Sequence, residues 1–184
     1  MSLFTSSKEK KLWLYALLVC VAILSTLALG RPLQEMLRDQ NIQAVFFLLG
    51  MILTAATVTV HGLSVRPGKT EMSIWFGLAA VYLMFIFRMG APERSHLIEY
   101  SVLAIFIYKA LLERLRDNSH FLLPALIAFA ATTVIGVFDE SIQKLLPSRV
   151  FDPLDMLFNS LAAFMAISGS IILQWARKKF RKNK

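Results

Sequence analysis

Long apolar stretches separated by short polar connections make up most of this sequence. Six of them reach the roughly 17 residues that an α-helix needs to cross the hydrocarbon core of a membrane. They cover residues 12–30, 44–63, 72–91, 96–112, 121–138 and 156–175. Turn signals such as Arg66-Pro67-Gly68 lie between them, and a backbone in lipid must satisfy its own hydrogen bonds. The pattern therefore predicts an all-α polytopic membrane protein with six transmembrane helices.

The predicted helix at 96–112 is the least apolar, because it contains His96, Glu99 and Lys109. Charged side chains resist insertion into lipid, so we expect this helix to insert with the help of its neighbours. The first helix ends in a passable signal-peptidase site, Ala28-Leu29-Gly30, so removal of this helix as a signal peptide is an alternative. Cleavage there would leave the topology of the other five helices unchanged.

Composition supports a membrane protein and excludes a soluble one. The chain of 184 residues is 57% hydrophobic and only 17% charged, so a soluble monomer would expose a large hydrocarbon surface. A single cysteine, Cys20, allows neither an internal disulfide nor a cysteine-based metal site. Lysine and arginine punctuate the apolar runs instead of forming a basic surface, which argues against a nucleic-acid partner.

The basic residues are distributed unevenly across the predicted membrane. Fourteen of the 20 lysine and arginine residues fall on the side of both termini, and 6 fall on the other side. Because basic residues resist translocation, we expect both termini to be cytoplasmic. The basic residues within 177–184 then form a cytoplasmic tail that lies against anionic lipid headgroups.

Eight of the 12 acidic residues fall on the opposite, outer side, and most lie near the ends of the last three predicted helices. Spacings of three and four residues place several polar side chains on one face of each helix. These residues are His96, Glu99 and Tyr100 on the fourth helix, Asp139, Glu140 and Gln143 on the fifth, and Asp155 and Asn159 on the sixth. Carboxylates at this depth are costly unless they are paired or hydrated. The sequence therefore predicts one shared polar pocket, with Arg149 in the adjoining loop.

Small residues continue two of these polar faces toward the middle of the membrane. On the fifth helix they are Gly136, Thr132 and Ala128, and on the sixth they are Ala162, Ala166 and Ser170. Small residues at intervals of four are typical of helices that pack closely in lipid. We therefore expect the carboxylates of the fifth helix to lie on a packing face and not on a lipid-facing one.

Several of these polar residues occur in the order of a known family pattern. Asp139-Glu140-Ser141-Ile142-Gln143, Pro147-Ser148-Arg149, Asp155 and Asn159 together resemble the D-E-x-x-Q, P-x-R, D-x-x-x-N pattern of the VanZ-like membrane proteins. Upstream, His96 and Tyr100 resemble the H-x-x-x-Y of that family. Two positions depart from it, since Ile142 stands where histidine is common and Ala162 stands where glycine is common.

The resemblance covers about residues 72–173 and implies a domain organisation. We expect a VanZ-like four-helix transmembrane domain at 72–176, two additional transmembrane helices within 1–71, and the basic tail at 177–184. The resemblance also implies a multi-pass protein of a bacterial cell membrane. The family's namesake is associated with low-level resistance to the glycopeptide teicoplanin, which implies a role in cell-envelope physiology.

The resemblance implies that the pocket binds or organises a lipid-linked envelope precursor or a glycopeptide antibiotic, with membrane lipids as further partners. The expected binding residues are Tyr100, Gln143, Arg149 and Asn159. An alternative is an enzyme that acts on a lipid-linked envelope substrate. Its candidate catalytic residues are His96, Glu99, Asp139, Glu140 and Asp155. In that case His96 or Glu140 would be the general base, and Arg149 would bind a phosphate or carboxylate.

Further interpretations of the pocket stay open at this point. The same residues can form a structural network that holds the outer helix ends together, with Arg149 paired to Asp139 or Asp155. Transport is disfavoured, because no charge lies at the predicted midplane and no internal repeat is present. A metal site formed by His96 with Glu99, Asp139, Glu140 or Asp155 is a disfavoured alternative, because the sequence has no H-E-x-x-H or H-x-x-E-H spacing. We therefore expect no metal, and no cofactor either, since no nucleotide, haem or flavin motif is present.

Overall fold

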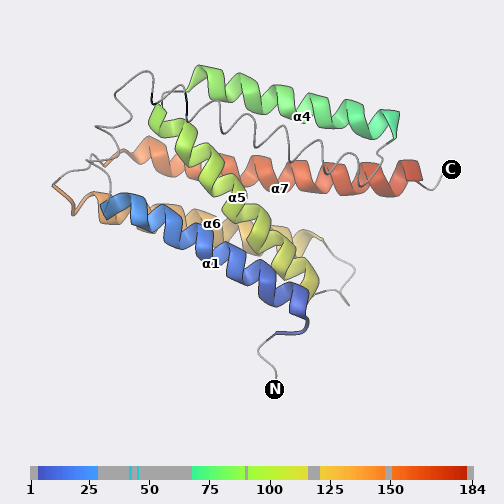
Figure 1. Cartoon of the computed structure of the whole chain (residues 1–184), viewed down its shortest axis with the longest axis horizontal. Coiled ribbons are helices and arrows are strands. Elements are labelled where there is room, and N and C mark those ends of the chain that lie inside the picture. The colour runs from blue at the N-terminus through green and yellow to red at the C-terminus, as the bar shows by residue number, and fades with distance from the viewer. Residues whose placement is uncertain are drawn as a thin grey trace.

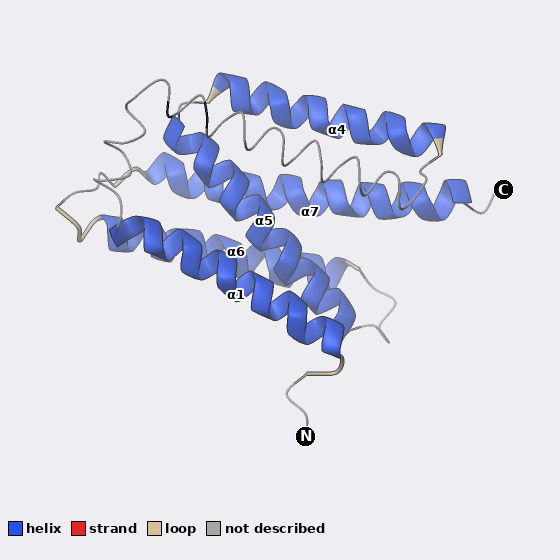
Figure 2. Ribbon diagram, in the orientation of Figure 1, coloured by secondary structure: helices blue, strands red, loops and turns tan. Residues whose placement is uncertain are grey.

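A computed structural model describes residues 4–28, 42, 45, 68–89, 91–115, 121–147 and 151–181. Every element in these ranges is a helix (Figures 1 and 2). The helices are α1 (Ser7–Ala28), α4 (Lys69–Arg88), α5 (Ala91–Arg114), α6 (Leu122–Gln143) and α7 (Pro153–Arg181). In the described part of the chain, these five are long and apolar enough to cross a membrane, so the protein is an all-helical, multi-pass membrane protein. The predicted second helix at 44–63 lies, apart from Val45, outside the described residues.

Polar residues extend the last two helices beyond the predicted apolar runs. α6 continues five residues past position 138, and its hydrogen bonding runs on to Lys144, whose N–H donates to the carbonyl of Glu140. α7 continues to Arg181, so part of the predicted basic tail is helical. Lysine and arginine favour helices and complement the negative end of the helix dipole, which explains the extension of α7.

α5 lies at the centre of the described bundle. It packs against α1, α6 and α7, whereas α4 packs against α7 (Figure 1). Its buried side chains form much of the core and include Leu97, Leu103, Ala104, Ile107 and Tyr108. The large apolar side chains of the outer helices point away from this core, among them Phe76 and Phe87 of α4. The least apolar helix is therefore the one most sheltered from lipid, as expected for a helix that inserts with help.

Side-chain contacts at the two ends of the bundle give the direction of each helix. At one end, Lys8 of α1 contacts Glu113 of α5, and Arg177 of α7 contacts Glu71 of α4. At the other end, the first turns of α5 and α7 meet the last turns of α6. α1, α4 and α6 therefore run in one direction, and α5 and α7 run in the opposite direction (Figure 1).

Candidate functional site

One end of the bundle gathers polar side chains from three helices. We define this group as the Glu140 cluster: His96 and Tyr100 of α5, Asp139, Glu140 and Gln143 of α6, and Asp155 and Asn159 of α7. Most of these side chains are buried, and Glu140 and Asn159 are completely inaccessible to solvent. Glu99 is half-buried and does not belong to the closely spaced group of His96, Asp139 and Glu140. Arg149 lies outside the described residues. The helices thus place seven of the nine sequence-predicted site residues in one cluster.

Gly136 allows the three helices to approach closely beneath this cluster. A Cβ atom at this position would lie 2.9 Å from Cβ of Asn159 and 3.2 Å from Cε1 of Tyr100, closer than atoms normally pack. Thr132 and Ala128, one and two turns nearer the start of α6, are completely buried on the same face. This face is therefore a packing face, as the small residues in the sequence indicate.

Hydrogen bonds from neutral donors orient the two carboxylates of α6. The hydroxyl of Tyr100 donates to Oδ2 of Asp139 over 3.1 Å. The side-chain amide of Gln143 donates to Oε1 of Glu140 over 2.8 Å and to Oδ2 of Asp139 over 3.4 Å. Gln143 follows these acids by three and four residues on the same helix, which is the spacing that brings side chains together. The two carboxylates therefore have fixed positions relative to α5 and α6.

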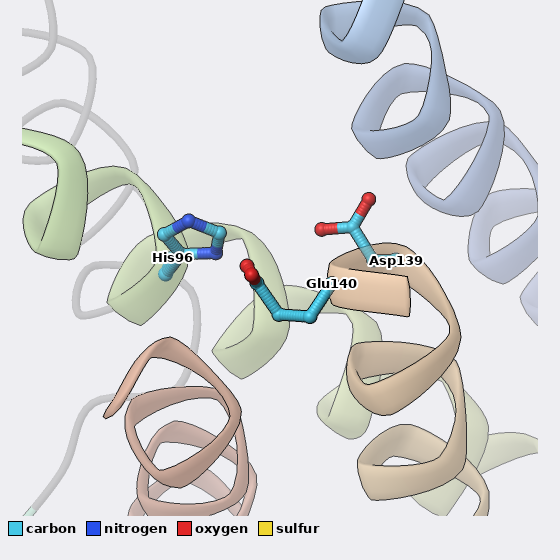
Figure 3. A group of neighbouring side chains, drawn as sticks. All are labelled: His96, Asp139 and Glu140. Carbon is cyan, nitrogen blue, oxygen red and sulfur yellow. The ribbon is translucent and has the colours of Figure 1, made fainter. Parts of the chain in front are cut away.

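His96 faces these carboxylates from α5 (Figure 3). Its ring stacks on that of Tyr100, with the ring centroids 6.0 Å apart. Its Nε2 lies 3.9 Å from Oδ2 of Asp155, which brings the first turn of α7 to the site. One ligand-type atom from each of His96, Asp139 and Glu140 lies within 4.8 Å of the others. An imidazole nitrogen and two carboxylate oxygens at this separation form a possible metal-binding group.

Sequence spacing does not reveal this group, because His96 and Asp139 are 43 positions apart and lie on different helices. Ser101 is a polar residue near this site that sequence spacing also does not reveal. Its hydroxyl donates to the carbonyl of Ala162 on α7 and contacts the hydroxyl of Tyr82 on α4 at 3.4 Å. Serine is common in apolar helices, so only its position next to Tyr100 would have drawn attention to it.

A second polar group at the opposite end of the bundle provides a comparison. We define this group as the Glu9 cluster: Thr5, Ser6, Lys8, Glu9, Trp13, Glu113 and Arg114. The buried carboxylate of Glu9 accepts hydrogen bonds from the N–H and hydroxyl of Thr5, from the indole of Trp13 and from Arg114. The S-x-x-E spacing of Ser6 and Glu9, typical of a helix start, is the sequence signal for part of this cluster.

The two clusters differ in how completely their buried polar atoms are satisfied. In the Glu9 cluster, lysine and arginine pair with the two carboxylates. In the Glu140 cluster, Nδ1 of His96, Oε2 of Glu140 and both amide atoms of Asn159 have no hydrogen-bond partner among the described residues. Because unsatisfied buried polar groups destabilise a protein, their concentration at one end is typical of a site that receives a ligand. Comparisons with protein families, curated proteins and solved structures found no match to this chain.

Proposed function

We propose that this protein is a VanZ-like protein of the bacterial cell membrane whose Glu140 cluster is a binding site at the extracytoplasmic face. In this proposal the site takes part in cell-envelope physiology by binding a lipid-linked envelope precursor or a glycopeptide antibiotic. The observation that supports it best is the set of buried, unpartnered polar atoms on His96, Glu140 and Asn159. A ligand with polar groups would satisfy these atoms, because buried polar groups in proteins are nearly always hydrogen-bonded.

The proposed topology has six transmembrane helices with both termini in the cytoplasm. α1 and α4 run in the same direction, which supports the proposal of one further transmembrane helix between them, the one that the sequence predicts at 44–63. The Glu9 cluster is then at the cytoplasmic face, where most lysine and arginine residues of the sequence fall. The Glu140 cluster is at the outer face, which an envelope precursor or an antibiotic can reach.

A purely structural role for the Glu140 cluster is the main competing explanation. The Glu9 cluster illustrates what such a role requires, because its buried carboxylate has four hydrogen bonds, one of them from an arginine. No ion pair of Glu140 with a lysine or arginine is present in the part of the chain that the structure describes. A buried acid without a cation costs stability, so it is better explained as part of a site.

An enzyme acting on a lipid-linked envelope substrate is the second candidate. Asp155 lies 3.9 Å from Nε2 of His96, and a carboxylate in this position orients an imidazole. His96 would then be the general base, with Arg149 binding a phosphate of the substrate. Hydrolysis of a lipid-linked precursor by the purified protein, lost in His96→Gln, would favour this candidate over binding alone.

Matched carboxylate substitutions at the two ends of the bundle test the proposed binding function. Glu140→Gln changes the proposed site, and Glu71→Gln removes a buried acid that is paired with Arg177 at the opposite end. We expect Glu140→Gln to unfold at the wild-type temperature or above it, while losing retention of an undecaprenyl-linked precursor in native mass spectrometry and altering teicoplanin susceptibility of producing cells. Glu71→Gln should lower the unfolding temperature and retain the precursor. A destabilised Glu140→Gln protein with unchanged precursor retention and teicoplanin susceptibility would instead establish the structural role.

A further inference from the structure

We propose that His96, Asp139 and Glu140 bind a divalent transition-metal ion, for which Zn²⁺ is the best chemical match. This inference rests on the proposed binding function and names a ligand of the same site. It goes beyond the sequence, which contains none of the short metal-binding spacings and separates the histidine from the two acids by an entire transmembrane helix pair.

The spacing of the three side chains is suitable for one ion. Their ligand atoms lie within 4.8 Å of one another, with the imidazole on α5 and both carboxylates on α6 (Figure 3). Ligand atoms at about 2.1 Å from a tetrahedral Zn²⁺ are roughly 3.4 Å from each other, so binding has to shorten the separations of up to 4.8 Å by as much as about 1.4 Å. The long side chain of Glu140 can supply this movement, because it extends from α6 toward His96.

The donor set selects among metal ions. One imidazole nitrogen with two carboxylate oxygens suits Zn²⁺ and other first-row transition ions, whereas Ca²⁺ and Mg²⁺ prefer oxygen ligands only. Three protein ligands leave a coordination position for water or for a phosphate or carboxylate of a second ligand. Asp155, at 3.9 Å from Nε2 of His96, is close enough to take part in the same site.

Neighbouring donors already hold the ligands as metal sites require. Tyr100 and Gln143 both donate to Oδ2 of Asp139, and Gln143 also donates to Oε1 of Glu140. Oε2 of Glu140 and Nδ1 of His96 are buried and have no hydrogen-bond partner among the described residues. Outer hydrogen bonds of this kind fix the orientation of ligand side chains in characterised metal sites.

The charge of the cluster provides an independent argument for a cation. Two buried carboxylates lie side by side, and the third carboxylate, Asp155, is at the same end of the bundle. Placing like charges together in a low-dielectric region is costly, and a divalent ion removes this cost. Arg149 of the adjoining loop, outside the described residues, is the competing source of positive charge. The experiment therefore has to separate an arginine from a metal ion.

Metal content of the full chain is the direct test. The protein is purified in detergent, stripped with a chelator, dialysed against Zn²⁺ and analysed for zinc, and a second sample is titrated with Co²⁺ as a spectroscopic probe. We expect one Zn²⁺ per chain and the visible absorption bands of Co²⁺ in a low-symmetry site with a nitrogen ligand. His96→Gln and Glu140→Gln each remove a ligand and should weaken Co²⁺ binding by more than about tenfold, the smallest loss typical when only an outer hydrogen-bond partner of a ligand is removed.

Two control variants accompany these measurements. Glu71→Gln removes a buried acid at the opposite end of the bundle, and Arg149→Gln removes the competing cation; both should retain one Zn²⁺ per chain. Absence of Zn²⁺ and of the Co²⁺ bands from the folded wild-type protein overturns the proposal without depending on any variant. Retention of the ion in both His96→Gln and Glu140→Gln overturns it as well.

The failure of this inference is distinguishable from the failure of the proposed function. A protein that retains the envelope precursor but binds neither Zn²⁺ nor Co²⁺ has a binding site without a metal. A protein that binds Zn²⁺ through His96 and Glu140, but retains no precursor and leaves teicoplanin susceptibility unchanged, has a metal site with another role.

Discussion

Gly136 determines how closely α6 can approach the two helices beside it. Its missing side chain leaves room for Cβ of Asn159 and for the ring of Tyr100, and both of these residues belong to the Glu140 cluster. The geometry of the cluster therefore depends on a residue that has no functional group. At the same level, Asn159 is completely buried with both amide atoms unpartnered among the described residues. Gly136 thus allows tight helix packing, whereas the unpartnered amide of Asn159 lowers the stability of the protein.

Gly136→Ala is expected to destabilise the protein. The new methyl group would lie within 2.9 Å of Asn159, so α6 and α7 must separate, at a cost of about 1–3 kcal/mol in the free energy of unfolding. Gly169→Ala is the matched control, because there the nearest atom to a new Cβ is a Leu78 methyl at 3.7 Å, an ordinary contact. Thermal unfolding in detergent measures both. Equal unfolding temperatures for the two variants would contradict the close approach at Gly136.

Asn159→Leu is expected to raise the unfolding temperature while reducing ligand binding. Leucine has nearly the shape of asparagine, and it removes two buried polar atoms that lack partners among the described residues. Relieving an unsatisfied buried group is worth about 1–3 kcal/mol. Thermal unfolding and precursor retention are measured on the same preparation. A lower unfolding temperature with full precursor retention would show that Asn159 serves stability.

At the scale of the element, α5 is the helix on which both polar clusters depend. It contributes His96 and Tyr100 to the Glu140 cluster and, near its other end, Glu113 and Arg114 to the Glu9 cluster. Its charged and polar residues make it the least apolar of the predicted helices, yet α1, α6 and α7 surround it. Polar residues at both ends therefore fix its depth and rotation within the bundle.

Glu9→Gln is expected to loosen the packing of α1 on α5. The carboxylate of Glu9 accepts four hydrogen bonds. In glutamine, an NH₂ group replaces one of the two accepting oxygens and would face the N–H and O–H groups that now donate to it, which lowers the free energy of unfolding by on the order of 2 kcal/mol. Glu113→Gln is the control in the same cluster, because its partner Lys8 is 72% exposed and such pairs contribute less than about 1 kcal/mol. Thermal unfolding compares them, and an equal loss in both variants would argue against a special role for Glu9.

The sequence predicts the presence of the helices well, and it predicts their ends and their mutual contacts less well. Apolar runs indicate the helices because lipid demands them, but the run at 121–138 stops short of Asp139, Glu140 and Gln143, which continue α6. Their spacing of three and four residues does assign these residues to that helix, but their close approach to Tyr100 and His96 on α5 is visible only in the structure. Similarly, Glu71 and Arg177 are placed on one side of the membrane by their predicted helices, whereas their ion pair is visible only in the structure.

The membership of the Glu140 cluster was accessible from sequence, and its chemistry was not. Spacings of three and four residues place the polar side chains on helix faces, and basic-residue counts assign them to one side. Hydrogen-bond saturation decides whether such a cluster is structural or available to a ligand, and this property depends on distances between helices. The contrast between Glu9, with four hydrogen bonds, and Glu140, with one unpartnered oxygen among the described residues, has no counterpart in the sequence.

At the scale of the whole molecule, the described helices form a bundle with one polar cluster at each end. α1, α4 and α6 run against α5 and α7, so consecutive predicted spans alternate in direction where the structure describes them. Most of the described basic residues lie at the end of the Glu9 cluster, and most of the described acidic residues lie at the end of the Glu140 cluster. The proposed orientation follows from this separation, with the basic end in the cytoplasm.

Single cysteines test the proposed orientation. Cys20 is the only cysteine, so Cys20→Ser provides a background without thiols. Leu145 is 81% exposed beyond the end of α6, and Lys178 is exposed near the opposite end of α7. In intact cells, a membrane-impermeant maleimide should label Leu145→Cys and should label Lys178→Cys only after the membrane is opened. Labelling in the reverse order would place the Glu140 cluster in the cytoplasm and contradict the proposed function.

Between the two clusters, the described helices carry no charged side chain. On α5 this stretch runs from Glu99 to Lys109, a distance of about 15 Å along the helix, and the corresponding parts of α1, α4, α6 and α7 are also uncharged. In electrical terms, this part of the protein is an insulating layer between two charged surfaces. An ion would lose its solvation in crossing such a layer, which is prohibitively expensive without polar partners. Within the described helices, an ion at the Glu140 cluster therefore meets no charged side chain along the bundle until it reaches the level of Lys109 and the Glu9 cluster.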